Sequence, residues 1–110
     1  MNALTILTAP HAPRCTNATV EALTGQMPDR LLLYGTSVLE ELQRQGYEIE
    51  LAWGLGYKTL RGMIRNMPKG SYYIATSGHA MALVDGVLTD TEGRGFDKRR
   101  IQAIFKVVPL

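Results

Sequence analysis

The sequence has few of the features that mark membrane, secreted or disulfide-stabilised proteins. A single cysteine among 110 residues excludes an internal disulfide bond. No apolar run approaches the roughly 18 residues that a membrane span needs. The first residues also lack the basic and long apolar regions of a secretory signal. We therefore expect a soluble protein of the reducing cytoplasm, or of the host cytoplasm if the protein is viral.

Net charge is also small. Twelve basic and ten acidic side chains leave a formal charge of +2, which gives no support for a nucleic-acid or membrane partner. Apolar residues make up 45% of the chain, enough for one hydrophobic core in a protein of this length. Because no repeat, low-complexity tract or linker divides the sequence, we predict a single domain over residues 1–110.

The first half of the chain has the apolar spacing of helices. Cys15, Ala18, Ala22 and Leu23 recur at intervals of three and four residues, and Gly25 follows where a helix would stop. This pattern makes Cys15 a residue of the first helical turn. The same reasoning predicts a helix from about Asp29 to Gly46, a loop over residues 51–57 and a short helix over residues 59–67.

The second half changes to the pattern of β-strands. Runs of β-branched and aromatic residues separated by turn residues occupy 71–76, 79–84, 87–91 and 101–108. Between the second and third runs, Asp85-Gly86 is typical of a two-residue type I′ hairpin loop. Helices followed by strands predict an α+β fold, with N-terminal helices packed on a four-stranded, mainly antiparallel sheet.

The predicted hairpin fixes a register, and the register brings two polar residues together. The expected pairs are Val84–Val87, Leu83–Leu88, Ala82–Thr89 and Met81–Asp90. Since side chains alternate between faces, His79 shares a face with Met81 and therefore with Asp90. His79 and Asp90 become diagonal neighbours, about 7–8 Å apart between backbones. We predict a hydrogen bond between the imidazole and the carboxylate.

A cysteine at a helix N-terminus is a natural partner for such a histidine. The helix dipole and a nearby imidazolium both favour the thiolate. The chemistry that follows is acyl transfer: the Cys15 sulfur attacks an acyl carbon, His79 accepts and returns the proton, and Asp90 orients the ring. Backbone N–H groups at the start of the helix, including that of Cys15, are candidates for binding the oxyanion.

Three segments of the chain resemble the papain-like cysteine peptidases, in particular small, phage-type domains. "RCTNATVEALTG" is similar to the nucleophile helix, "GSYYIATSGHAMALVDGVLTDT" to the block of strand, His, hairpin and Asp, and "RRIQAIFKV" to the last strand. The resemblance implies a papain-like fold and a triad of Cys15, His79 and Asp90. It also implies a thiol-dependent acyl hydrolase, a cysteine peptidase or isopeptidase, that acts on a peptide or protein without a cofactor.

The sequence departs from that family before the nucleophile. Papain relatives usually carry Gln or Asn there as an oxyanion donor, whereas residues 9–14 contain neither. His11 and the backbone of Cys15 are therefore the candidates for this role. Trp53 and Tyr57, which lie beside two glycines, are candidates for a wall of the substrate cleft, although core packing is the alternative for Trp53.

Other interpretations remain open at this stage. A lone cysteine in an apolar helix is by default a small buried residue, and a strand histidine is often satisfied by a backbone carbonyl. The alternative function is a papain-like binding module without turnover, such as a phage protein that inhibits a host factor. One cysteine and two histidines without metal-ligand spacing predict no metal site.

Overall fold

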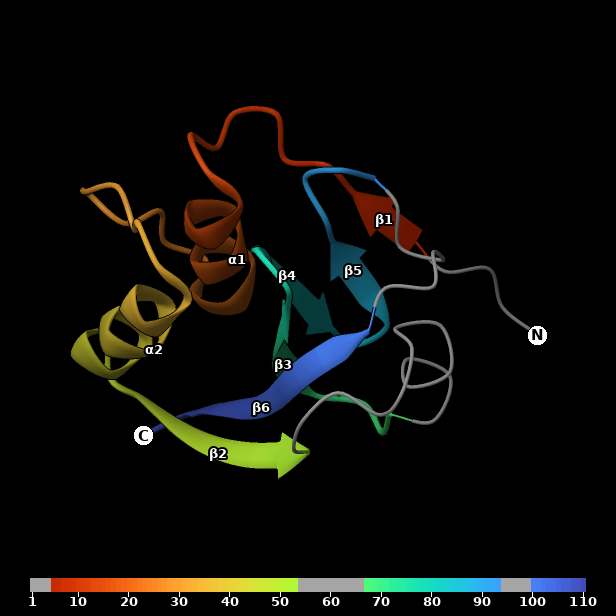
Figure 1. The fold of residues 1–110 in the computed structure, drawn as a ribbon. Helices are drawn as coiled ribbons and strands as arrows, with labels where there is room; N and C mark the ends of the chain where they lie inside the picture. Colours follow the sequence, from red (N-terminus) through yellow and green to blue (C-terminus); the bar gives the residue numbers. More distant parts are fainter. Residues whose placement is uncertain (1–4, 54–66, 94–99) are drawn as a thin grey trace.

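The computed structural model describes residues 5–53, 67–93 and 100–110. In chain order, these residues form β1 (Thr5–Leu7), α1 (Cys15–Thr24), α2 (Gly35–Arg44), β2 (Tyr47–Trp53), β3 (Ser71–Thr76), β4 (His79–Val84), β5 (Val87–Thr89) and β6 (Ile101–Pro109) (Figure 1). The predicted helix over 59–67 lies outside the described residues, apart from Met67. Among the described helices, none has the length and apolar character to cross a membrane.

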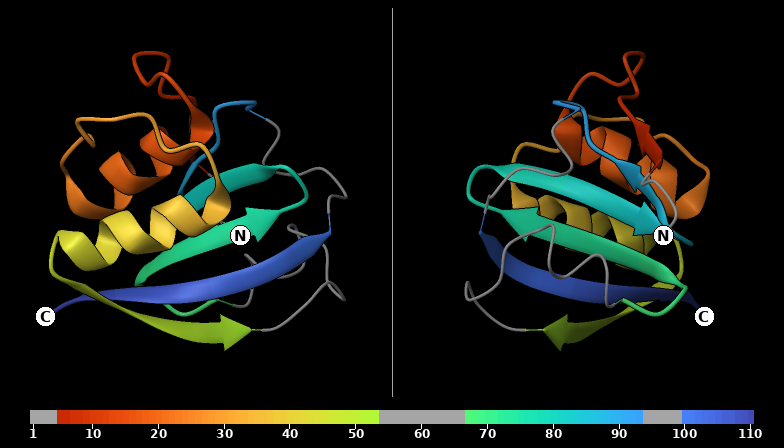
Figure 2. Two further views of the ribbon diagram at one scale, coloured as in Figure 1. Left: turned by 60° about the vertical axis from the view of Figure 1, so that its left-hand side comes forward. Right: turned by 90° about the vertical axis from the view of Figure 1, so that its right-hand side faces the viewer.

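The strands form one six-stranded sheet in the order β1-β5-β4-β3-β6-β2. The β1–β5 pair is parallel and the other pairs are antiparallel. Both described helices cover the same face of this sheet (Figure 2). The α+β class is therefore confirmed, but the prediction of four strands is wrong, because β1 and β2 add a strand at each edge.

Two apolar clusters lie on opposite faces of the sheet. On the helix face, Val20 of α1 and Val38 of α2 pack against Tyr73, Ala80 and Ala82. The opposite face carries a second buried cluster, formed by Tyr72, Ile74, Met81, Leu83, Leu88, Ile101 and Ile104. The alanines of β4 leave little side-chain volume between this strand and α1, so the helix lies close to the sheet.

The first helix begins and ends as predicted. Arg14 is its N-cap, with extended backbone, and Cys15 is its first residue. At the other end Gly25 adopts φ 81°, a left-handed conformation that glycine enters without steric cost. Its N–H donates to the carbonyl of Glu21 at 2.8 Å, which satisfies one of the last helical acceptors.

The second helix begins six residues later than predicted, at Gly35 in place of Asp29. Leu32 explains the difference. Its side chain is buried, and side chains of α1 bind both of its backbone polar groups: Asn17 accepts from the N–H, and Thr16 donates to the carbonyl. Those backbone groups are not available to a helix, so residues 29–34 run as a connecting segment against α1.

The β4–β5 hairpin has the predicted turn and three of the four predicted pairs. Asp85 has φ 47° and Gly86 has φ 85°, as a type I′ turn requires. The observed pairs are Val84–Val87, Leu83–Leu88 and Ala82–Thr89. The ladder recorded for this pair of strands ends there, so Met81 and Asp90 do not form the additional ladder pair that the sequence predicts.

Candidate active site

Cys15 lies half-buried at the start of α1, facing the beginning of β4. The side chain of His79 and the backbone of Ala80 and Thr16 lie near enough to the sulfur to lower the pKa of the thiol, with His79 the largest of these causes. The first turn has no side-chain cap, and the positive end of the helix dipole therefore acts on the sulfur as well. Each of these contacts is stronger with a thiolate than with a thiol.

His79 is fixed in orientation by Asp90. The ring Nε2 lies 2.7 Å from Asp90 Oδ1, and the two side chains are 6% and 0% exposed. This is the contact that the hairpin register predicts. Nε2 is bound to the carboxylate, so Nδ1, which lies 3.8 Å from Glu92 Oε1, is the ring nitrogen that could exchange a proton with the thiol of Cys15.

Asp90 is itself held from two directions. The Glu92 backbone N–H donates to Asp90 Oδ1 at 3.0 Å, and the Asp90 backbone N–H donates to the carbonyl of Leu7 at 2.9 Å. The second bond anchors the residue to β1, the strand that the sequence interpretation missed. The carboxylate therefore sits on a rigid backbone instead of a free strand end.

The electrostatics of the three residues are mutually consistent. The hydrogen bond to Asp90, followed by that to Cys15, raises the pKa of His79 to about 9. The hydrogen bond from His79 lowers the pKa of the Cys15 thiol, against the opposing effect of its partial burial. Both shifts favour a thiolate–imidazolium pair at neutral pH. Burial, with the nearby Cys15 charge adding to it, also raises the pKa of Tyr73 to about 12.

A cavity of about 340 Å³ opens beside the sulfur. The start of α1, the end of the connecting segment, the β3–β4 turn and β6 all contribute to it. Its lining residues are Arg14, Cys15, Thr16, Leu33, Tyr34, Gly35, Tyr73, Ala75, Thr76, Gly78, His79, Ala80 and Gln102. Both the nucleophile candidate and the base candidate therefore face the same space.

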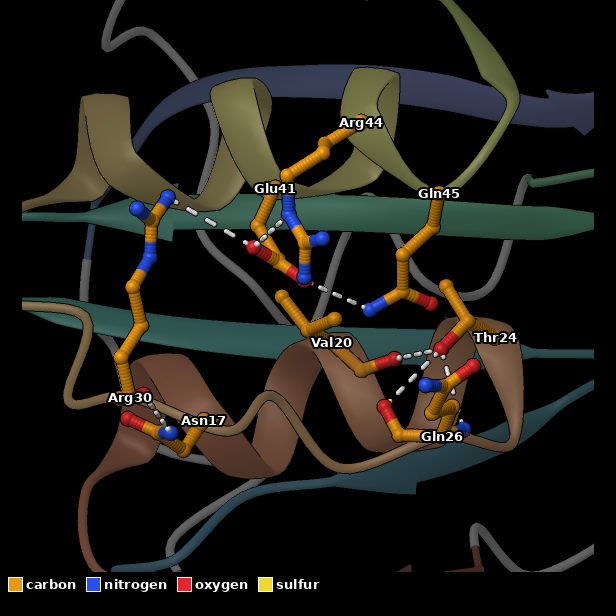
Figure 3. Close-up of polar contacts among 8 residues, drawn as sticks. All are labelled: Asn17, Val20, Thr24, Gln26, Arg30, Glu41, Arg44 and Gln45. Carbon is orange, nitrogen blue, oxygen red and sulfur yellow. Dashed lines mark hydrogen bonds and ion pairs between the residues drawn. The ribbon is translucent and has the colours of Figure 1, made fainter.

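An ion-pair network holds the connecting segment, residues 29–34, at Arg30 (Figure 3). Arg30 contacts the fully buried carboxylate of Glu41 at 3.5 Å, and Arg44 and Gln45 bind the same group at 2.7 and 2.9 Å. These contacts, Arg44 foremost, lower the pKa of Glu41. Asn17 Nδ2 donates to the carbonyl of Arg30 at 2.8 Å. The wall formed by Leu33 and Tyr34 is thus supported from both helices.

Of the other predicted site residues, the structure describes the side chain of His11, which does not line this cavity. His11 is bound to Glu21 on the flank of α1 and lines a separate cavity of about 460 Å³, so the backbone of Cys15 is the oxyanion candidate that lies at the site. Of Trp53 the structure describes only the backbone, at the end of β2, and Tyr57 lies outside the described residues. Within the described ranges, no three His, Cys, Asp or Glu side chains cluster as metal ligands would.

The sequence interpretation missed Tyr73, Thr76 and Gln102, all of which line the cavity. They belong to segments with ordinary strand patterns, so their position depends on the pairing of β3 with β6, which no short-range signal encodes.

Comparison with models of known protein families finds no match, and comparisons with curated proteins and with solved structures find none either.

Proposed function

We propose that the protein is a thiol-dependent acyl hydrolase in which Cys15 is the nucleophile, His79 the general acid and base, and Asp90 the residue that orients the histidine. One observation carries the proposal. The single cysteine stands at the start of a helix and lines the same cavity as a histidine that is bound to a fully buried carboxylate. This is the combination of activated thiol, base and orienting group that acyl transfer requires.

The first half of the reaction forms a thioester. The Cys15 sulfur attacks the acyl carbon, and the carbonyl π electrons move onto oxygen to give a tetrahedral oxyanion near the first-turn backbone N–H groups. As the carbonyl re-forms, the bond to the leaving group breaks. The leaving group takes its proton from the His79 imidazolium, which becomes neutral.

The second half returns the enzyme to its starting state. Neutral His79 accepts a proton from water, and the resulting oxygen nucleophile attacks the thioester. The carbon–sulfur bond breaks, the thiolate is released beside the imidazolium, and the acid product leaves. Asp90 keeps Nδ1 directed at the reacting atoms and stabilises the imidazolium in both halves.

The substrate class proposed is a peptide or isopeptide bond, and the fold proposed is papain-like. The resemblance of three chain segments to the papain-like cysteine peptidases supports both proposals. So does the order of the parts: the nucleophile candidate on the first helix, then the histidine at the start of β4 and the carboxylate directly after β5, the next strand of the sheet.

Alkylation of Cys15 by iodoacetamide tests the proposal. We expect the rate to remain high at pH values where glutathione, used as a model thiol, is protonated and slow. The His79→Gln variant should lose this advantage, because it removes the group that most lowers the thiol pKa.

A matched measurement uses His11→Gln, which changes the other histidine and leaves the cavity at Cys15 intact; its alkylation profile should equal that of the parent. If the parent itself reacts like glutathione at every pH, the thiol is not activated. The binding module without turnover then replaces the hydrolase.

A further inference from the structure

Strand β6 contains an irregularity directly at the cavity. Ala75 of β3 pairs with Ala103, yet the next residue, Thr76, pairs with Ile101. Two consecutive residues of β3 thus face positions of β6 that are two apart, and Gln102 is the extra residue. This is a β-bulge, a feature that redirects a side chain and is common beside active sites.

The burial pattern of β6 agrees with this description. Ile101 and Ile104 both lie in the cluster on the face opposite the helices and are both 0% exposed. Residues three apart fall on opposite faces of a regular strand, so the bulge between them is what puts both inside. As the extra residue, Gln102 does not follow the alternation of side chains between the two faces, and it lines the cavity with Cys15 and His79.

Three hydroxyl groups of the cavity wall donate hydrogen bonds within the protein. Thr16 donates to the carbonyl of Leu32, Tyr73 donates to Gly35 at 3.3 Å, and Thr76 donates to His79 at 3.4 Å. Within the described part of the chain, no hydrogen bond is recorded for the Gln102 amide. Arg14 and Tyr34 also line the cavity, but both lie on connecting segments directly before helices. The backbone of Gln102, in contrast, is held in a strand between the buried side chains of Ile101 and Ile104.

We infer that Gln102 is a further catalytic residue: its side-chain N–H donates to the acyl oxygen as that oxygen becomes negative. This inference rests on the proposed hydrolase function. In the step concerned, the sulfur–carbon bond forms, the carbonyl π electrons move to oxygen, and the amide of Gln102 and the backbone N–H of Cys15 stabilise the oxyanion. The same contacts relax when the carbonyl re-forms and the leaving group departs with the proton of His79.

Two reagents separate this role from thiol activation. p-Nitrophenyl acetate acylates a thiolate through a tetrahedral oxyanion, and the p-nitrophenolate burst measures that step. Iodoacetamide reacts with the same sulfur by direct displacement at carbon, without an oxyanion. A donor to the oxyanion therefore affects the first reaction and not the second.

The test variant is Gln102→Met, which keeps the length of the side chain and removes its N–H. We expect acylation to slow by roughly 10²-fold, as for loss of one oxyanion donor in other acyl-transfer enzymes, with unchanged alkylation. Gln102→Glu, which also lacks the N–H and adds a negative charge, should slow acylation at least as much. The matched control is Gln43→Met, the same substitution at an exposed position of α2 outside the cavity; it should change neither rate.

The outcomes distinguish the inference from the function on which it rests. If the parent is not acylated at Cys15, the hydrolase proposal and the role of Gln102 fall together. If the parent is acylated and Gln102→Met reacts equally fast, the role of Gln102 alone is wrong. A Gln102→Met protein that loses alkylation together with acylation assigns the residue a structural role and also overturns the inference.

Discussion

The interaction between His79 and Asp90 predicts a specific dependence of stability on pH. In the parent, the thiol of Cys15 and the ring of His79 titrate against each other, so their effects on unfolding partly cancel. Replacing Cys15 by Ala removes the thiol and leaves the histidine with Asp90 and with the more exposed Glu92, whose Oε1 lies 3.8 Å from Nδ1. The comparison is then between Cys15→Ala and the double variant that also carries Asp90→Asn, which keeps an acceptor but loses the charge.

The sign and size follow from the pKa of His79. In the folded parent this pKa is raised from 6.5 to about 9, with Asp90 as the largest cause and Cys15 as the second. A raised folded pKa stabilises the protein fully below pH 6.5, and the stabilisation is lost as pH rises through the folded value. The full shift corresponds to about 3 kcal/mol. Cys15→Ala should retain less than this, because the contribution of the thiol is gone.

Two measurements check the prediction. NMR titration of the ring protons, assigned with a His11→Gln variant, should give a His79 pKa above 6.5 in Cys15→Ala and a lower value in the double variant. Urea unfolding should show that Cys15→Ala loses stability between pH 6 and pH 9, by less than about 3 kcal/mol, and that the double variant loses less still. Equal His79 pKa values in the two proteins would refute the assignment of Asp90 as the orienting group.

Two further predictions concern the framework of the site. Gly86→Val should destabilise the protein by about 1–2 kcal/mol. Since φ is 85° there and the surrounding space is open, backbone strain accounts for the whole cost. Gly86→Asn should destabilise the protein less, and equal melting temperatures for the two variants would contradict the type I′ turn. Asn17→Ala should lower the free energy of unfolding by about 1–3 kcal/mol for each backbone group it leaves unpaired, namely the N–H of Leu32 and the carbonyl of Arg30. An Asn17→Ala protein as stable as the parent in urea would show that water replaces both bonds.

The parts of the site that the sequence predicts are those that depend on local geometry. Asp85-Gly86 sets the turn, and the turn sets the register up to Ala82–Thr89, which brings Asp90 near His79; the bond from the Asp90 N–H to the carbonyl of Leu7 is the long-range contact that then fixes Asp90. Likewise, the apolar spacing after Arg14 locates Cys15 in a first helical turn, where the structure has it.

The parts that the sequence does not predict depend on contacts between distant segments. β1 has three residues, and its pairing with β5 is parallel, so no hairpin motif in the sequence predicts this strand. β2 includes residues 51–53, which resemble a loop beside Gly54 but form the end of an edge strand paired with β6. The start of α2 is set by the buried side chains of Thr16 and Asn17, which fix the backbone of Leu32.

The two halves of the candidate site lie far apart in the chain, and this has a consequence for when the protein acquires reactivity. His79 and Asp90 are eleven residues apart, His79 at the start of β4 and Asp90 directly after β5, so their contact can form early, whereas Cys15 reaches them only when α1 docks on β4. During synthesis the cysteine leaves the ribosome well before the histidine does. Until docking, its sulfur is an ordinary thiol with few reactions open to it at neutral pH. In a nascent or partly unfolded chain the thiol of Cys15 therefore has low reactivity. The reactivity of Cys15 then measures the fraction of molecules whose tertiary structure is complete.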